Sequence, residues 1–335
     1  ESSRDHNKTP FKKLKGVFYS IFLYLFLINY TFMNYTRKLH SRILFLITIC
    51  FISSCNKRES NYITYYQKVN EIDSIFRFAN QPEIAVKEYG KLFEKYEPRN
   101  QEKIREYETY IVLADKYNID FGGKKSIKKL IYLTAPYSVF GSGKEYYTLY
   151  KKYGIDSTEV QKEITNWKNS LDKILVDSLT IAMIRDQKYR SKEDYDKDLF
   201  MLADAKNSTL LKHIFEKYGY PSIYKAGFKG NDGTNINVRT VILHMAESKD
   251  YEYLKNKLYE FIKLGECPPE IYSEFIDRHE SIFRKQILYA DYGIIENLDT
   301  TLIDKNRKAI GIPSIKHKQK IGRDRHAFKD LVETL

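Results

Sequence analysis

Apolar residues recur at a spacing of three and four along most of the chain after residue 60, and this period constrains the fold more than any other feature. Between residues 63 and 78, one stripe collects Ile63, Tyr66, Val69, Ile72, Ile75 and Phe76. Such a stripe is typical of a helix that packs one face against a core. Few stretches alternate apolar and polar residues as a strand would. The sequence therefore predicts an all-α fold.

Proline, glycine and capping residues divide this pattern into helices. We expect helices at residues 63–78, 83–96, 102–117, around Leu130, 156–190, from Ser191 to Tyr218, 238–247, 251–264, after Pro268-Pro269, and 301–310. Asp156 with Glu159 and Ser191 with Asp194 have the spacing of a capping box. Residues 225–235 are rich in glycine and predict a loop.

Two helical regions are expected, with a boundary near Gly154. Short connections between the first helices favour antiparallel neighbours, so residues 62–153 predict an N-terminal array of antiparallel helix pairs. Residues 154–315 predict a C-terminal helical domain, and residues 316–335 form a basic tail. A solvated, partly disordered tail accounts for that composition.

Residues 37–55, RKLHSRILFLITICFISSC, combine a basic head with a short apolar run. A run of about ten apolar residues is too short to cross a bilayer, which takes roughly 20 residues as a helix. The layout is that of a secretory signal peptide. Its ending, Ile52-Ser53-Ser54-Cys55, resembles a bacterial lipobox. The resemblance implies cleavage before Cys55 and lipid attachment to Cys55, whereas an uncleaved membrane anchor is the alternative.

The residues ahead of this signal suggest a later translation start. Starting at Met33 gives a signal peptide of ordinary length at residues 33–54, followed by a polar tether at residues 55–61. Residues 1–32 are then expected to be upstream translation. The alternative is an extra hydrophobic segment from Val17 to Met33, which is apolar enough to span a membrane and is preceded by lysines.

The residues after Cys55 predict the address. The residue after Cys55 is Asn56 and not aspartate. By resemblance to sorted lipoproteins, this favours the outer membrane. The sequence NKRESN lacks the acidic run that directs some lipoproteins to the cell surface. We therefore expect the protein to face the periplasm and to contact the membrane through the lipid on Cys55.

The net charge is +12, from 56 basic and 44 acidic residues. Half of this excess lies before Cys55, where eight basic residues face two acidic ones, so 48 minus 42, or +6, remains afterwards. The remaining charge is spread along the chain, whereas nucleic-acid binding takes clustered charge on one face. We expect no nucleic-acid partner, and binding through the basic tail is the weaker alternative.

Cysteine usage excludes two classes of stabilising site. The cysteines are Cys50 in the signal, Cys55 at the lipobox, and Cys267. One cysteine in the remaining chain allows neither an internal disulfide nor a metal site built from cysteines. We expect no metal and no cofactor.

Short polar islands recur in a fixed order after the middle of the chain. They are Asp186–Arg190, Asp204 with Asn207, Lys217–Pro221, Leu243–Ala246, Asp277-Arg278, Gln286–Tyr289, and Asp304–Lys308 with Gly311. Their order and spacing resemble a bacterial family known as domain of unknown function six-six-two-four. The chain departs from the family pattern at several places, for example at Tyr220, where members have tryptophan. The resemblance implies no reaction, because the family has no established activity.

The islands supply the candidate site residues. If Asp186, Asp277 and His244 meet in one polar cleft, a histidine oriented by a carboxylate would act as a general base. Arg190 and Arg278 would hold an anionic group, as hydrolysis of a phosphate or carboxyl ester requires. Gln286 and Tyr289 are further ligand-binding candidates.

Structural explanations compete with this hydrolase hypothesis. Asp186 and Arg190 lie four residues apart, where ordinary helix ion pairs form. His244 lies in an apolar helix, VILHMA, where a hydrogen-bonded core histidine fits as well. No Gly-x-Ser-x-Gly or His-Glu-x-x-His motif accompanies these residues.

The first functional hypothesis is a binding or scaffolding module for an envelope protein or a glycan, and the second is the hydrolase. Tyrosines gather at helical spacing in two segments and would form a sugar- or peptide-binding face, although packing explains the spacing too. They are Tyr146, Tyr147, Tyr150, Tyr153, Tyr251, Tyr253 and Tyr259. The sequence does not decide whether the protein is an enzyme.

Overall fold

The structure, a computed structural model, describes residues 61–141, 143–190, 195–293 and 299–333. These residues belong to one compact unit, Ser60–Leu335. The signal peptide, Cys55, the membrane span considered upstream of it, most of the tether, and the capping box at Ser191 lie outside the described residues. The predictions about them stay predictions.

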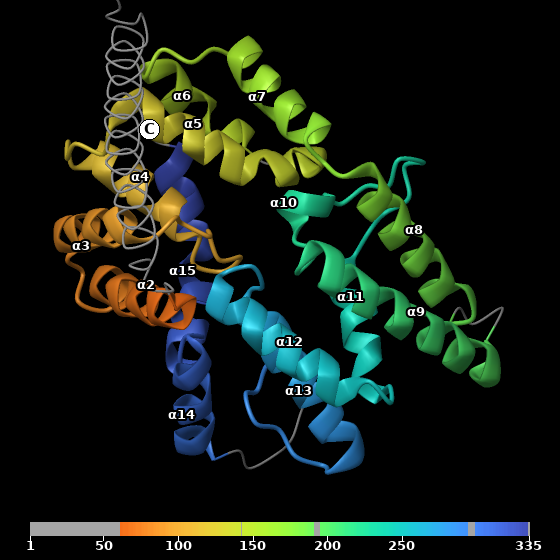
Figure 1. The fold of residues 1–335 in the computed structure, drawn as a ribbon. Coiled ribbons are helices and arrows are strands. Elements are labelled where there is room, and N and C mark those ends of the chain that lie inside the picture. Colours follow the sequence, from red (N-terminus) through yellow and green to blue (C-terminus); the bar gives the residue numbers. More distant parts are fainter. Residues whose placement is uncertain (1–60, 142, 191–194, 294–298, 334–335) are drawn as a thin grey trace, which may run out of the picture. The chain divides into compact units, whose positions relative to one another are not determined.

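The first part of the unit is a series of helices in which neighbours along the chain pack together (Figure 1). The helices are α2 (Tyr62–Arg77), α3 (Pro82–Lys95), α4 (Glu106–Lys116), α5 (Gly123–Thr134), η1 (Ala135–Phe140), η2 (Lys144–Tyr146), α6 (Tyr147–Lys152) and α7 (Ser157–Asn169). Contacts join α2 to α3, α3 to α4, and α4 to α5. Short connections thus produce adjacent helices, as expected.

The second part continues with helices that pack less strictly in chain order. They are α8 (Lys173–Lys188), α9 (Lys197–Tyr218), α10 (Ile223–Ala226), α11 (Val238–His244), η3 (Met245–Glu247), α12 (Tyr251–Leu264), α13 (Pro269–Phe283), α14 (Thr300–Ile310) and α15 (Ile315–Glu333). In Figure 1, α8 and α9 lie side by side, and α11 packs against both α8 and α13.

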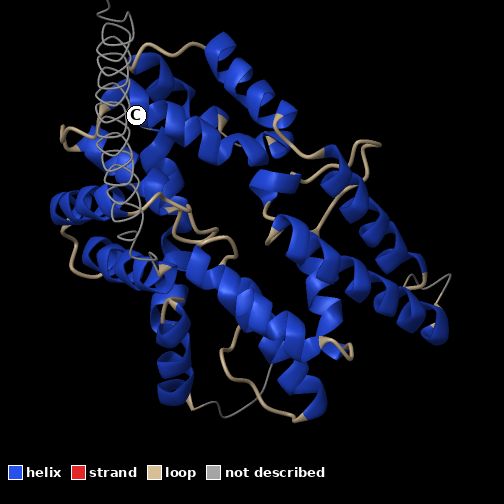
Figure 2. Ribbon diagram, in the orientation of Figure 1, coloured by secondary structure: helices blue, strands red, loops and turns tan. Residues whose placement is uncertain are grey.

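The all-α prediction is confirmed for the described residues, among which Figure 2 shows helices and loops and no strand. The glycine-rich loop at residues 225–235 is closed by an isolated bridge between Lys229 and Asn235. No helix in the described ranges combines the length and hydrophobicity needed to cross a membrane.

Two expectations about helices were wrong. The helix expected at residues 156–190 is divided into α7 and α8, because Asp172 caps a new helix by accepting a hydrogen bond from the Leu175 N–H at 2.9 Å. The basic tail is helical, in α15, where His317 is buried rather than solvated.

Helix α2, the first described helix, packs against the last two helices, α14 and α15, as well as against α3 and α12. Gly311, with φ of +87°, permits the close approach of α14, because a Cβ there would lie 2.6 Å from Tyr66 Cβ. Asn70 donates to the Gly311 carbonyl at 2.8 Å, and His317 Nε2 lies 2.7 Å from Asp73 Oδ2. The first and last helices are thus joined by polar contacts as well as by packing.

One core runs through the unit, from Tyr62 to Val332. Contacts cross the position near Gly154, where α5 packs on α7 and Tyr224 donates a hydrogen bond to the Leu133 carbonyl at 3.1 Å. The division into two domains near Gly154 stays a prediction.

Candidate functional site

The structure brings four of the polar residues of the islands together, and we call them the His244 cluster: Asp186, Arg190, Asp204 and His244. His244 ends α11 and Asp186 lies in the last turns of α8, and these helices pack together. His244 Nδ1 lies 2.7 Å from Asp186 Oδ1. An ionised carboxylate only accepts, so this contact fits an Nδ1–H donated to Asp186 and leaves Nε2 as the basic nitrogen.

Arg190 joins the two carboxylates of the cluster. Its Nη2 donates to both oxygens of Asp204, at 2.5 and 2.6 Å, and its Nε lies 3.7 Å from Asp186 Oδ1. Gln187 donates to the other Asp186 oxygen at 2.6 Å. Burial raises the pKa of Asp204, against the lowering effect of Arg190. The main partner of Arg190 is therefore Asp204, not Asp186.

Asp277 takes a structural role away from this cluster. Its two carboxylate oxygens accept hydrogen bonds from four backbone N–H groups, those of Leu288, Tyr289, Asp291 and Tyr292. Burial raises the pKa of Asp277, and these hydrogen bonds oppose the rise. The grouping of Asp277 with His244 in one site finds no contact in the structure.

The remaining predicted ligand-binding residues are also occupied by protein partners. Arg278 donates to Glu247 at 2.6 Å and to the Tyr292 hydroxyl at 2.7 Å. Gln286 donates to Glu280, and the Tyr289 carbonyl accepts from Arg307 at 2.5 Å. These contacts give the three residues a role in fixing the segment after α13.

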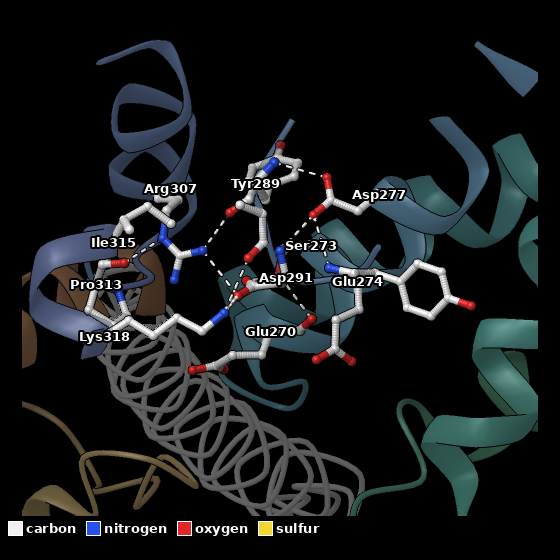
Figure 3. Close-up of polar contacts among 12 residues, drawn as sticks. Glu270, Ser273, Glu274, Asp277, Tyr289, Asp291, Arg307, Pro313, Ile315 and Lys318 are labelled. Atoms are coloured by element: carbon white, nitrogen blue, oxygen red, sulfur yellow. Dashed lines mark hydrogen bonds and ion pairs between the residues drawn. The ribbon is translucent and has the colours of Figure 1, made fainter. Parts of the chain in front are cut away.

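That segment is held by what we call the Arg307 network, which comprises Ser273, Asp291, Arg307 and Lys318 (Figure 3). Arg307 is fully buried and donates to the Pro313 carbonyl at 2.5 Å and to Asp291 at 3.0 Å. Lys318 and Ser273 each donate to Asp291 at 2.6 Å. Burial alone would raise the pKa of Asp291, but Arg307 and Lys318 hold it below its usual value. The network connects α13, α14 and α15.

A large hollow of the described unit lies elsewhere, and we call it the aromatic cleft. It has a volume of about 790 Å³. Segments from both sides of Gly154 line it: the loop at residues 97–102, the end of α5 with η1, residues 220–228, residues 235–239, and the start of α13. Neither His244 nor Asp186 contributes to its lining.

Aromatic rings form the wall of this cleft in two groups. Tyr132 stacks on Tyr224, with ring centroids 6.1 Å apart and planes at 16°. Phe228 contacts Phe140 edge to face at 5.0 Å, and Tyr137 at 5.5 Å. Tyr132 and Phe140 remain 49% and 63% exposed, so their rings are open to solvent.

The loop at residues 97–102 places buried polar atoms without partners beside these rings. Gln101 is 4% exposed, and neither its Nε2 nor its Oε1 finds a hydrogen-bond partner among the described residues. The same holds for Asn100 Oδ1 and Arg99 Nε. Buried polar side-chain atoms are normally paired, so these two donors and two acceptors are exceptions. They belong to residues that line the cleft, although the atoms themselves have almost no accessible surface.

The loop itself is held firmly. Glu106 accepts from the Gln101 backbone N–H and from the Tyr65 hydroxyl, both at 2.7 Å. Glu108 accepts from the Asn100 side-chain amide at 2.8 Å. Burial raises the pKa of Glu106 and of Glu108. The unpaired atoms therefore belong to a fixed loop.

Charged residues that line the cleft are mostly neutralised by one another. Lys225 lies 2.9 Å from Glu266, and Lys129 pairs with Glu97. Arg239 Nε donates to Glu274 at 2.6 Å. Burial raises the pKa of Glu274 to about 7, although Arg239 opposes the rise.

Sequence reasoning missed this cleft, because its lining comes from segments between residues 66 and 271. The tyrosines suggested for a binding face are not among its lining; Tyr146, Tyr150 and Tyr251 are buried, as packing requires. The nearest sequence signal was the glycine-rich loop, where Gly227 has a φ of +68° that favours glycine.

No metal centre is apparent in the described ranges, which contain no group of three or more histidine, cysteine, aspartate or glutamate side chains placed to bind an ion. Cys267 is a free, fully buried thiol whose pKa burial raises well above its usual value. A raised pKa leaves little thiolate, so Cys267 is a packing residue rather than a nucleophile.

Comparison with known proteins returns no relative: no protein-family model, curated protein or solved structure matches this chain.

Proposed function

We propose that this chain is a lipid-anchored envelope protein whose helical unit is a binding module, with its ligand in the aromatic cleft. The observation that carries the proposal is the buried Gln101 side chain, whose amide has no hydrogen-bond partner among the described residues. An unsatisfied buried amide costs about 1–3 kcal/mol. If the Gln101 side chain turns toward the cleft, a ligand that pairs with its amide would remove that cost. A concave aromatic site with a few polar groups is the usual form of a ligand site.

Native mass spectrometry of the protein purified from its host tests this proposal. The wild-type chain is expected to carry a bound molecule that Gln101→Leu loses, because leucine fills similar space without the amide. Gln161→Leu, on the exposed face of α7, is the matched control and should retain the molecule. A wild-type chain without any bound molecule, or one retained in full by Gln101→Leu, would contradict the proposal.

The envelope address is part of the same proposal and is supported by the signal peptide and lipobox that end at Cys55. The membrane would be contacted through the lipid, with the helical unit in the periplasm on the outer membrane. The intact mass of the membrane-extracted protein tests this point. A chain that begins at an acylated Cys55 is expected, and an unmodified chain that retains Met33 would overturn it.

We also propose membership of the family of unknown function six-six-two-four, supported by how the islands fall in space. Asp186, Arg190, Asp204, Asn207 and His244 lie together, since Arg185 beside them donates to Asn207 at 3.1 Å. Residues of the later islands, Asp277, Tyr289 and Arg307, gather around the Arg307 network. The islands thus form two polar groups, whose presence in a solved family member would support membership.

The second candidate function is a hydrolase in which His244 is the general base and Asp186 orients it. The 2.7 Å contact between His244 Nδ1 and Asp186 favours this candidate. The other ring nitrogen, Nε2, makes no hydrogen bond within the described residues and is free to act as the base. Loss of a general base costs about 10²–10⁴-fold in rate. Chromogenic carboxyl and phosphate esters would be tested with His244→Asn, and with the exposed His213→Asn as control. Equal rates for both variants would dismiss this candidate.

A further inference from the structure

We propose that the ligand of the aromatic cleft is a neutral oligosaccharide. This inference rests on the proposed function, since it takes the cleft as the binding site and identifies the class of molecule that fits. Three features select that class: the hydrogen-bonding character of the unpaired atoms, the pairing of the charges, and the faces of the rings.

The unpaired atoms have almost no accessible surface, so a ligand reaches them when these side chains turn toward the cleft, and it must then both donate and accept hydrogen bonds. Gln101 Nε2 and Arg99 Nε are donors, whereas Gln101 Oε1 and Asn100 Oδ1 are acceptors. Exchanging the two ends of the Gln101 amide changes nothing, because both are unpaired. A hydroxyl group donates one hydrogen bond and accepts others, so neighbouring hydroxyls of a sugar ring satisfy both kinds of atom. An acyl chain would satisfy none of them, and a carboxylate or phosphate would leave the acceptors unpaired.

The charges of the cleft disfavour an anionic ligand. Of the basic residues in the lining, Lys129, Lys225 and Arg239 are each paired with a glutamate. The Arg99 guanidinium lies over the Tyr62 ring, 4.5 Å from its centroid. An acidic molecule would have to displace or approach Glu97, Glu102 and Glu266, which also line the cleft. A neutral molecule can use these paired groups as hydrogen-bond partners without that repulsion.

The aromatic wall includes exposed rings, and aromatic rings are what a pyranose packs against. The face of an aromatic ring carries negative potential, and it attracts the slightly positive C–H groups on the apolar face of a sugar. Tyr132 is held by stacking on Tyr224, whose hydroxyl is fixed by the Leu133 carbonyl. Tyr132 and Phe140 are the exposed rings, so an oligosaccharide would place one unit near the buried amides and others along these rings.

Peptides are the nearest rival class, since their backbones also donate and accept. The described residues contain no strand that a peptide could extend. A proline-rich peptide suits tyrosine-lined grooves, but its proline nitrogens donate nothing and would leave Gln101 Oε1 and Asn100 Oδ1 without donors.

A glycan array followed by titration of the full chain in detergent tests the inference. Trp167 is the single tryptophan and donates to the Tyr224 carbonyl at 3.2 Å, so its fluorescence reports on the cleft. Neutral tri- and tetrasaccharides of glucose or N-acetylglucosamine are the soluble probes, with trigalacturonate as the acidic control and a proline-rich decapeptide as the rival. We expect a neutral probe to shift the Trp167 emission, and Gln101→Leu to weaken its binding at least tenfold, while Gln161→Leu does not.

The possible outcomes separate the inference from the proposed function. If no neutral glycan binds on the array or in solution, but native mass spectrometry finds a peptide or acidic molecule that depends on Gln101, the oligosaccharide is wrong and the binding function stands. If neither experiment finds a ligand, both fail. Binding of a neutral glycan that is unaffected by Gln101→Leu would also overturn the inference, because the glycan would then occupy another surface.

Discussion

The Arg307 network and the loop at residues 97–102 both bury polar side chains, but only one of them satisfies those side chains. Arg307, Asp291 and Lys318 exchange hydrogen bonds with one another and with backbone carbonyls. Gln101 is buried to a similar degree, and its amide has no hydrogen-bond partner in the part of the chain that the structure describes. A buried polar network whose groups are all paired holds helices in place. Buried polar groups without partners lower the stability of the fold. We therefore expect substitutions in the Arg307 network and at Gln101 to change stability in opposite directions.

The His244 cluster stands between these two cases. Asp186 is fully buried and has partners on both oxygens, as a structural carboxylate would. His244 has one nitrogen paired, and its side chain is 18% exposed. It lines no part of the aromatic cleft.

The largest effect is expected at Arg307, where the comparison predicts a purely structural role. Arg307→Met leaves Asp291 and two backbone carbonyls with fewer partners, and removing one member of a buried pair costs about 3–5 kcal/mol. Chemical denaturation measures this loss in the free energy of unfolding. Arg284→Met is the control, because Arg284 is 64% exposed and pairs with Glu280 at the surface; its cost should stay below about 1 kcal/mol. Equal costs for the two variants would remove the distinction between the regions.

A pH effect is expected at Glu270, which is buried in the first turn of α13 (Figure 3). Neither of its carboxylate oxygens has a hydrogen-bond partner among the described residues. Burial raises its pKa to about 7. Between pH 4.3, near the pKa of an unfolded glutamate, and pH 7, the unfolded chain loses this proton first, so stability falls as pH rises through this window.

Glu270→Gln removes that dependence. Relative to wild type, the variant should gain on the order of 2–3 kcal/mol of unfolding free energy between pH 4.5 and pH 8. Glu274, whose pKa is also raised to about 7, leaves a residual slope in both proteins. Urea denaturation across this pH range measures the difference. Parallel stability profiles for the two proteins would show that Glu270 ionises normally in the folded state.

Gln101→Leu is expected to increase the stability of the ligand-free protein. Replacing an unpaired buried amide by an apolar side chain of similar size removes a desolvation cost of about 1–3 kcal/mol, so the free energy of unfolding should rise by about 1 kcal/mol or more. Refolded protein, which carries no ligand from the host, is the sample for thermal and urea denaturation. A loss of stability would mean that the Gln101 side chain supports the fold.

The smallest effect on stability is expected at Tyr132, because its ring is half exposed. Tyr132→Ala should cost less than about 1.5 kcal/mol of stability, the range of one aromatic pair, and should weaken ligand binding by roughly tenfold. Tyr259→Ala, with a ring 37% exposed outside the cleft lining, is the matched control for both measurements. Titration by Trp167 fluorescence gives the affinities. Unchanged binding by Tyr132→Ala would exclude its ring from the site.

The spacing of apolar residues predicted most helices well. It failed where a short polar turn separates two helices. The bounds expected for α12 agree with the structure, because the apolar stripe and Gly265 define both ends. The break before α8 was not predicted, because Ser170 and Asp172 also suit the exposed face of a continuous helix. The structure shows that Asp172 is the N-cap of α8. The helical tail was missed because α15 is stabilised by distant partners, such as Asp73 for His317.

The candidate site was less predictable than the fold. A contact such as Asp186 with His244, 58 residues apart, could be guessed only because both residues are polar in an apolar setting. Asp277 is also a polar residue beside apolar ones in the sequence. Its partners, however, are backbone N–H groups, which the spacing of side chains does not predict. The aromatic cleft depends on loops from both halves of the unit, and the missing partners of Gln101 are visible only in three dimensions.

A crystal structure of the chain purified from its host tests the central claim most directly, because it shows what lies against Gln101. The account predicts density for a bound molecule between the Tyr132 and Phe228 rings, with groups within hydrogen-bond distance of both ends of the Gln101 amide. A cleft that contains only ordered water, with every unpaired atom of Arg99, Asn100 and Gln101 satisfied by it, would contradict the account.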